Sequence, residues 1–264
     1  MPNKLSVLQP EPNFKIIGHR GASGLAPENT LASFELAAKL GLNWVEFDTL
    51  RTATGEWVVI HDDTLDRTTN GTGRVDSVSY EYIKTLNNPI QKIPLLEEVL
   101  QHLLAWGVHP NIEIKSMQGN PDSLMQEFSE LLQNYWPKTH PPPFISSFDL
   151  NLLQALQHHQ PFLPLGYIIE KFSEDALIKT LQFGFKSLHC DYRYMQAADF
   201  AKAKAHNVPI LLYTINTPEL YHQFLKQEEV IAVFSDYPNL LKGSGVRHHV
   251  TPTPSLPRET GEGA

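Results

Sequence analysis

The chain has 264 residues, of which 41% are hydrophobic and 19% charged. It is therefore long enough for one large α/β domain or two small ones, and too apolar to be largely disordered. Its formal net charge of -8 argues against a nucleic-acid partner held by overall charge, so an anionic substrate would need local cations. The single cysteine, Cys190, excludes an intrachain disulfide and a zinc site made of thiolates.

The two ends of the chain differ in composition from the segment between them. The first residues, MPNKLSVLQPEPNF, lack the continuous apolar core of a signal peptide, and no window approaches the roughly 20 apolar residues of a membrane span. We therefore expect a cytoplasmic protein without an integral membrane segment, with residues 1–13 as an N-terminal extension. Residues 243–264 are rich in Gly, Pro and Thr without periodicity, which predicts a disordered tail in which His248 and His249 are simply solvated.

Short β-branched runs and amphipathic stretches alternate between residues 14 and 242. The predicted strands cover residues 14–19, 44–48, 110–115, 143–148, 163–169, 186–191, 208–215 and 231–236. Each precedes a predicted helix, at residues 29–41, 94–107, 123–136, 150–160, 173–184, 196–207, 218–227 and 237–243. Eight such units predict parallel strands and a single-domain (β/α)₈ barrel over residues 14–242, with a doubly wound sheet carrying extra strands as the alternative.

Residues 50–94 are too long for an ordinary connection between a strand and a helix. Within them, WVVIH (57–61) follows the turn-like TATG (52–55) and is typical of an added strand, whereas TTNGTG (68–73) is typical of a loop. The barrel is therefore predicted to carry a short insertion after its second strand.

Acidic side chains alternate with apolar ones in two of the predicted strands. Residues two apart share a face, so Glu46 and Asp48 point one way in WVEFD, and Glu113 and Lys115 point one way in NIEIK. An exposed antiparallel strand would explain one such pattern, but two are unexpected in a sheet that helices cover on its outer side. Three converging carboxylates would repel one another, and Lys115 offsets them only in part. The pattern therefore favours a site for one hard divalent cation, such as Mg²⁺, Ca²⁺ or Mn²⁺.

Two histidines end predicted strands of the same barrel. Most of the 12 histidines are expected to be structural, but His19 ends the first strand and His61 ends the added one. Imidazoles at the carboxyl ends of strands, beside a metal site, are candidates for proton transfer. Arg20 follows His19 and suits bidentate binding of a phosphate, with a surface salt bridge as the alternative role. A metal, two histidines, an arginine and a lysine together indicate phosphoryl chemistry.

Several of these segments also resemble a known family. HRGASGLAPENTLASF, EFDTLRTATGEWVVIHDDTLDRTTNGTG, IPLLEEVL and IEIK are similar to successive motifs of the glycerophosphodiester phosphodiesterases. The resemblance continues through SSF, YTINTPE and SDYP, and so covers about residues 14 to 242. It implies a TIM barrel that hydrolyses glycerophosphodiesters, such as glycerophosphocholine or glycerophosphoethanolamine, to glycerol 3-phosphate and an alcohol.

The resemblance also implies roles for individual residues. It makes His19 and His61 the catalytic pair, and Arg20 and Lys115 the cations that contact phosphate. The remaining roles fall to the metal ligands, Glu46, Asp48 and Glu113, commonly for Mg²⁺ or Ca²⁺, and to three residues around the substrate, Glu28, Phe148 and Tyr213.

Three of these positions carry alternatives or a departure from the family. Glu28, in PEN, would support the site, although from the sequence alone it could equally be a helix-start residue. Phe148 would be a substrate-side aromatic, or else part of the core. Tyr213 stands where the family often has tryptophan, which preserves an aromatic wall and leaves the preferred alcohol open.

Two other functions are compatible with these motifs. A lysophospholipase D-type enzyme would run similar chemistry on lipids and would want an apolar rim, which the sequence does not clearly show. An inactive barrel that only binds phosphodiesters would not need every proton-transfer and ligand position that this chain retains.

Overall fold

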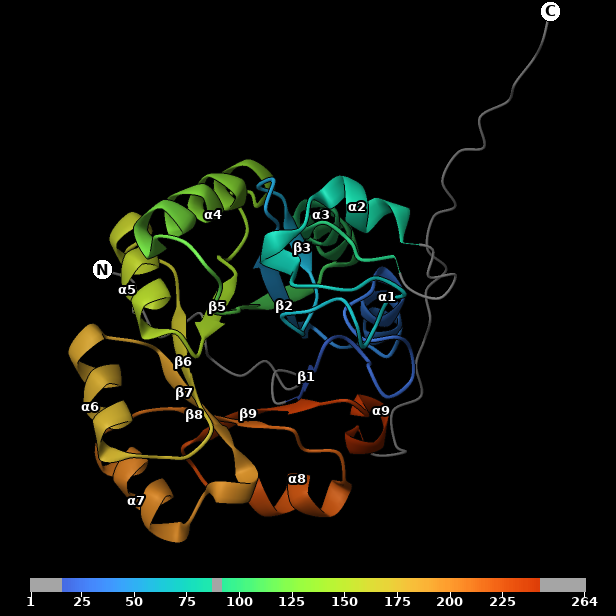
Figure 1. The fold of residues 1–264 in the computed structure, drawn as a ribbon. Coiled ribbons are helices and arrows are strands. Elements are labelled where there is room, and N and C mark those ends of the chain that lie inside the picture. Colours follow the sequence, from blue (N-terminus) through green and yellow to red (C-terminus); the bar gives the residue numbers. More distant parts are fainter. Residues whose placement is uncertain (1–15, 87–91, 243–264) are drawn as a thin grey trace, which may run out of the picture.

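The computed structural model describes residues 16–86 and 92–242. The predicted N-terminal extension, the first two residues of the predicted domain and the tail with its histidine pair lie outside the described residues. Within the described part, eight parallel strands close into a barrel, because β1 pairs with both β9 and β2 (Figure 1). These strands are β1 (Ile16–Gly18), β2 (Trp44–Arg51), β4 (His109–Ile114), β5 (Phe144–Ser147), β6 (Leu165–Ile169), β7 (Ser187–Asp191), β8 (Ile210–Tyr213) and β9 (Val230–Ser235). The predicted (β/α)₈ barrel is confirmed, and the doubly wound alternative is wrong.

Helices lie around the outside of the barrel strands (Figure 1). They are α1 (Leu31–Lys39), α2 (Tyr80–Thr85), α3 (Leu96–Trp106), α4 (Pro121–Tyr135), α5 (Leu150–His159), α6 (Glu174–Phe183), α7 (Ala197–Ala205), α8 (Pro218–Phe224) and α9 (Pro238–Leu241). Side chains cap several of them, as where Asn120 accepts hydrogen bonds from the first amides of α4. Gly107 and Gly184 end α3 and α6 in the left-handed conformation, which glycine adopts without strain.

The insertion after the second strand contains more structure than predicted. β3 (Trp57–Val59) pairs antiparallel with the end of β2, and that strand runs to Arg51, three residues beyond its predicted end. The helix α2 was not predicted, nor was a single turn of 3-10 helix at Val75–Ser77. A second such turn, Tyr192–Tyr194, was missed outside the insertion, after β7. A six-residue helix gives too short a pattern for periodicity, and α2 depends instead on its N-cap Ser79 and on burial of Tyr80 and Ile83.

Two layers of apolar packing leave the carboxyl end of the barrel for polar side chains. The outward-facing Val45, Phe47, Ile112 and Ile114 pack into one large core together with residues of the surrounding helices. The interior is filled by a second cluster of inward-facing side chains, Ile17, Trp44, Phe144, Leu211, Ala232 and Phe234. The inward positions of β2 and β4 that follow Trp44 toward the carboxyl end are polar (Glu46, Asp48, Asn111 and Glu113), and they form the candidate site.

Candidate active site

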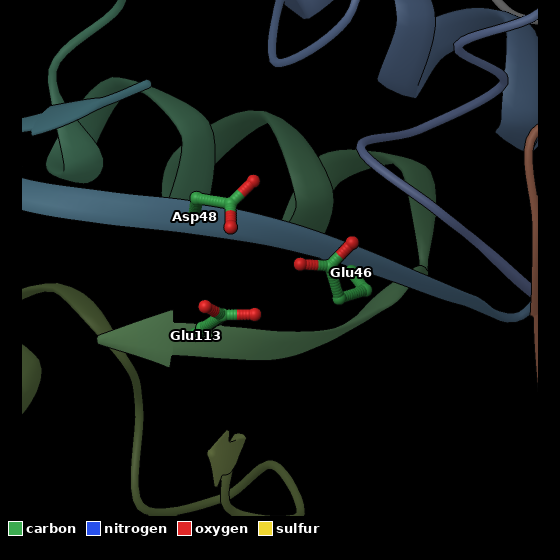
Figure 2. Close-up of side chains that lie close together, drawn as sticks. All are labelled: Glu46, Asp48 and Glu113. Carbon is green, nitrogen blue, oxygen red and sulfur yellow. The ribbon is translucent and has the colours of Figure 1, made fainter. Parts of the chain in front are cut away.

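Three carboxylates meet between β2 and β4. Asp48 and Glu113 are direct neighbours in the strand register, and Glu46 lies two residues earlier on β2. One oxygen from each of the three lies within 4.8 Å of the others, and Figure 2 shows the carboxylates facing one another between the two strands. Asp48 is 1% and Glu46 4% exposed, so water solvates them poorly. The alternation seen in the sequence therefore places the acids together as predicted.

The electrostatics of this cluster suit a cation. Burial, and then the charge of Asp48, raise the pKa of Glu46 to about 8, and burial and Asp48 also raise the pKa of Glu113. Oε1 of Glu46 is buried without a hydrogen bond, which is costly for a carboxylate oxygen unless another group satisfies it. An all-oxygen set of three acids, two of them buried, with one free oxygen fits one hard divalent cation. The cluster could hold such an ion.

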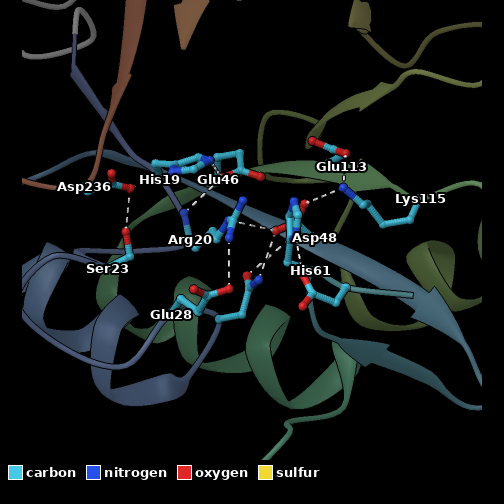
Figure 3. Close-up of polar contacts among 12 residues, drawn as sticks. His19, Arg20, Ser23, Glu28, Glu46, Asp48, His61, Glu113, Lys115 and Asp236 are labelled. Carbon is cyan, nitrogen blue, oxygen red and sulfur yellow. Dashed lines mark hydrogen bonds and ion pairs between the residues drawn. The ribbon is translucent and has the colours of Figure 1, made fainter. Parts of the chain in front are cut away.

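Lys115 and Arg20 provide positive charge at opposite sides of the cluster (Figure 3). Nζ of Lys115 lies 2.8 Å from Oε1 of Glu113 and 3.4 Å from Oδ1 of Asp48. Nε of Arg20 lies 3.5 Å from Oδ2 of Asp48, and the Arg20 amide donates to Oε2 of Glu46 at 2.9 Å. Burial opposes both charges, but the nearby carboxylates outweigh it, so the pKa values of Lys115 and Arg20 are raised and both remain cationic.

The backbone around Arg20 has an unusual conformation that serves these contacts. Arg20 has φ 51° and Asn29 has φ 56°, both in the left-handed region that non-glycine residues seldom adopt. The Asn29 amide donates to the carbonyl of Arg20, while its side chain donates to Oδ2 of Asp48 at 2.9 Å. Asn29 thereby fixes Asp48 against the loop that carries Arg20, a role that the sequence analysis did not assign.

His19 follows β1 and has a carboxylate partner at the end of β9. Its Nδ1 lies 2.7 Å from Oδ1 of Asp236, and its Nε2 faces Glu46 at 4.0 Å (Figure 3). Asp236 also accepts from Ser23 and Asn216, at 2.8 and 2.7 Å. Burial alone would lower the pKa of His19, but the bond to Asp236 and the charge of Glu46 outweigh it and raise that pKa.

His61 follows β3 and has a partner of its own. Its Nδ1 lies 2.6 Å from Oδ1 of Asp62. Burial lowers the pKa of His61, and the cations of Lys115 and Arg20 add to this effect against the charge of Asp48. In this arrangement both histidines have a carboxylate at Nδ1, which leaves each Nε2 free for the cavity.

The predicted residues surround one cavity of about 160 Å³ at the carboxyl end of the barrel. Nine predicted residues line it: His19, Arg20, Glu46, Asp48, His61, Glu113, Lys115, Phe148 and Tyr213. Phe148 is 46% exposed and meets Tyr213 edge to face at 6.5 Å, so it belongs to the cavity wall and not to the core. The tenth predicted residue, Glu28, does not line this cavity. It lies two residues before the N-cap Thr30 of α1, so it does not start that helix. Its carboxylate accepts a hydrogen bond from Arg20 at 2.9 Å.

Several residues of the site were missed in the sequence. Asp62 stands beside His61 in HDD, and Asp236 ends the last predicted strand in SDYP, so position beside a histidine or at a strand end was the available signal. Asn111, Ser146 and His189 also line the cavity, and the side-chain amide of Asn111 donates to Ser146 at 2.9 Å. These three occupy inward positions that the sequence analysis did not consider.

Comparison with known proteins agrees with this geometry. The family model described as the Glycerophosphoryl diester phosphodiesterase family matches residues 19–240. This chain belongs to that family. The chain is 30% identical to a glycerophosphodiester phosphodiesterase of Bacillus subtilis, over 90% of this chain and 88% of the relative. It is 31% identical to a glycerophosphodiester phosphodiesterase of Caldanaerobacter subterraneus, over 86% of this chain and 95% of that one.

A solved structure gives the same result. The barrel is similar to a phosphodiesterase from Oleispira antarctica, determined in complex with the product sn-glycerol-3-phosphate. The TM-score is 0.81 at 31% identity, over 86% of this chain and 95% of that one. The present chain is thus an enzyme with glycerophosphodiester phosphodiesterase activity. Among residues 16–86 and 92–242, no helix is long and apolar enough to cross a membrane.

Proposed function

We propose that this phosphodiesterase hydrolyses small, deacylated glycerophosphodiesters, such as glycerophosphocholine and glycerophosphoethanolamine, to glycerol 3-phosphate and an alcohol. The observation that carries the proposal is the composition of one cavity, which combines two imidazoles, three carboxylates and two cations. The Oleispira antarctica enzyme, with product sn-glycerol-3-phosphate, supports the same class of substrate.

We assign Glu46, Asp48 and Glu113 as the ligands of one divalent cation, Mg²⁺ or Ca²⁺, with Mn²⁺ as a further candidate. Bound there, such a cation would stabilise negative charge on the phosphoryl oxygens. Arg20 and Lys115 would bind the same oxygens, since both side chains are held at the cluster by carboxylates and keep their charge.

We assign proton transfer to His19 and His61. One imidazole takes the proton of the attacking hydroxyl, the bond from phosphorus to the leaving oxygen breaks, and the other imidazole gives a proton to that oxygen. Water or the 2-hydroxyl of glycerol would serve as nucleophile in the same geometry. Asp236 and Asp62 keep a proton on Nδ1 of each ring, so that Nε2 of each exchanges protons with the reacting groups.

The test compares two single variants on two kinds of substrate. His19→Ala and His61→Ala should each lower kcat on glycerophosphocholine by about 10²- to 10⁴-fold, with a much smaller change in substrate affinity. A p-nitrophenyl diester has a leaving group that needs no protonation, so it should restore turnover only in the variant that lacks the general acid. Near-normal turnover of either variant on glycerophosphocholine would remove that histidine from the mechanism.

A lipid substrate is an outcome of the same assay. Release of choline from lysophosphatidylcholine at a higher kcat/KM than from glycerophosphocholine would assign the enzyme to the lysophospholipase D type instead.

A further inference from the structure

Arg67, in the loop after β3, contacts two carboxylates at once. Its Nε and Nη2 donate to the two oxygens of Asp62, at 2.5 and 2.9 Å. Its Nη1 and Nη2 donate to the two oxygens of Glu28, at 3.0 and 2.7 Å. One planar guanidinium thus connects the loop after β3 with the loop after β1 through two bidentate pairs.

Each of these carboxylates has a second partner in the candidate site. Glu28 accepts from Nη1 of Arg20 at 2.9 Å, and Asp62 lies against Nδ1 of His61 at 2.6 Å. Charges of alternating sign therefore run from Arg20 through Glu28 and Arg67 to Asp62, and Asp62 contacts the ring of His61. Arg67 touches neither end of this series, but it fixes both of the carboxylates that hold those ends.

We propose that Arg67 is a positioning residue that fixes the side chains of Arg20 and His61 relative to each other through Glu28 and Asp62. The inference rests on the proposed function of those two residues in binding phosphate and transferring protons. Through Glu28, Arg67 orients the guanidinium that binds phosphate. Through Asp62, it restrains the carboxylate that keeps a proton on Nδ1 of His61.

An ordinary surface ion pair would not connect two residues of the candidate site in this way. Exposed pairs contribute little to stability, and the side chain of Arg67 is 48% exposed. The loop backbone is also held without it, since Leu65 is fully buried and its amide donates to the carbonyl of Gly73 at 3.0 Å. Loss of Arg67 should therefore leave the fold in place and release the two carboxylates.

The same insertion offers a matched control. Arg74 makes a bidentate pair with Asp76 at 2.9 and 2.7 Å and is 39% exposed, close to the exposure of Arg67. Neither residue of that pair lines the cavity of the candidate site. Arg74→Ala thus removes an arginine, a bidentate pair of the same kind and an ion pair with Asp63 at 3.5 Å, but no contact to a residue of the proposed machinery.

The first experiment measures turnover of glycerophosphocholine by the full-length, metal-loaded enzyme. We expect Arg67→Ala to lower kcat by about 10- to 100-fold and to raise KM severalfold, the usual loss when an outer partner of a site is removed. Arg74→Ala should change both values less than twofold. Arg67→Lys should recover only part of the loss, because an ammonium cannot pair with two carboxylates in bidentate fashion.

Double variants separate the effect of Arg67 through Asp62 from its effect through Glu28. In an Asp62→Asn background, the further change Arg67→Ala should lower kcat less than twofold, because its route to His61 is already lost. In a Glu28→Gln background, the same change should leave KM nearly unaltered. Fully additive effects in both backgrounds would overturn the proposal, and so would an Arg67→Ala variant that behaves like Arg74→Ala.

A second readout needs no turnover. Nitrogen-15 spectra of the histidine rings, assigned with His61→Gln, should show the Nδ1–H tautomer of His61 in the parent enzyme and a mixture of both tautomers in Arg67→Ala. An unchanged tautomer would refute the proposed effect of Arg67 on His61 through Asp62. A parent enzyme that fails to hydrolyse glycerophosphodiesters would count against the proposed function alone, since this measurement still decides the positioning role.

Discussion

Replacing Asp236 by asparagine tests the proposed role of His19 in proton transfer. The Asp236 carboxylate accepts from His19 and Ser23 on Oδ1 and from Asn216 on Oδ2. Asn216 cannot turn its amide around, because its own Oδ1 already accepts from the Asp236 amide and from Ser235. The new amide of Asp236→Asn must therefore present its oxygen to Asn216 and its NH₂ group to His19.

This orientation puts His19 into the wrong tautomer. An NH₂ group opposite Nδ1 needs an acceptor there, so the ring proton moves to Nε2. As a base or as an acid, the ring must exchange a proton at Nε2 while Nδ1 keeps one, so both roles are lost. The missing hydrogen bond to a charged group is worth about 1.5–3 kcal/mol, which is roughly 10- to 150-fold in rate. The same exchange in a serine protease, where the tautomer also changes, costs about 10⁴-fold. We therefore expect kcat to fall by about 10²- to 10⁴-fold.

The double variant Asp236→Asn/Asn216→Asp provides the decisive comparison. The carboxylate at position 216 would still accept from the amide of residue 236, and it would also accept from the new NH₂ group. The amide oxygen then faces His19 and restores the proton on Nδ1. Because a neutral acceptor replaces a charged one, we expect kcat about tenfold below the parent and well above the single variant. Steady-state release of choline from glycerophosphocholine measures all three enzymes, with Ser23→Ala, expected to lose less than tenfold, as control. A double variant no faster than Asp236→Asn, or a single variant within threefold of the parent, would refute the reasoning.

Two further predictions concern metal and acid. Because the pKa of Glu46 is raised to about 8, the metal-free site holds a proton at pH 7, and a cation must displace it. The affinity for the cation should therefore rise about tenfold per pH unit up to about pH 8. EDTA should abolish activity, and Mg²⁺, Ca²⁺ or Mn²⁺ should restore it. Calorimetric titration at pH 6 to 9 measures this, and pH-independent affinity or full activity without metal would contradict it. Burial lowers the pKa of His189 from 6.5 to about 3. Between these pH values the unfolded chain binds a proton at His189 that the folded chain does not. The stability present above pH 6.5 is therefore lost as the pH falls toward 3. The free energy of urea unfolding of the parent, relative to His189→Gln, should thus fall by up to about 1.4 kcal/mol per pH unit between pH 6 and 4, and a constant difference would show that His189 is not held neutral.

The parts of this enzyme that could be predicted from the sequence are those encoded by local patterns. Alternation in β2 and β4 placed Glu46, Asp48 and Glu113 on one face, and strand–helix alternation gave the barrel that brings those faces together. Both inferences need only the side-chain period of a strand and the covering of a parallel sheet by helices.

Asp62 was missed although it follows His61 directly in the sequence, whereas the other partners of the candidate site residues were missed because they depend on how distant loops meet. Asp236 reaches His19 only when β9 pairs with β1 across 217 residues of chain. Arg67 reaches Glu28 through the path of an irregular loop, and Asn29 reaches Asp48 through a left-handed backbone conformation that no hydrophobic pattern records. Such contacts follow from tertiary geometry, and spacing along the chain gives no measure of them.

The pairing of β1 with β9 also has a consequence for protein synthesis. A nascent chain exposes His19 first and has acquired all three carboxylates of the cluster by residue 113, long before the ribosome has added Asp236. Until β9 pairs with β1, His19 lacks its carboxylate partner Asp236, and the sheet is still open between these two strands. A barrel without its last strand therefore has the three acids but not the His19–Asp236 pair, so closure of the barrel and formation of this pair are the same event.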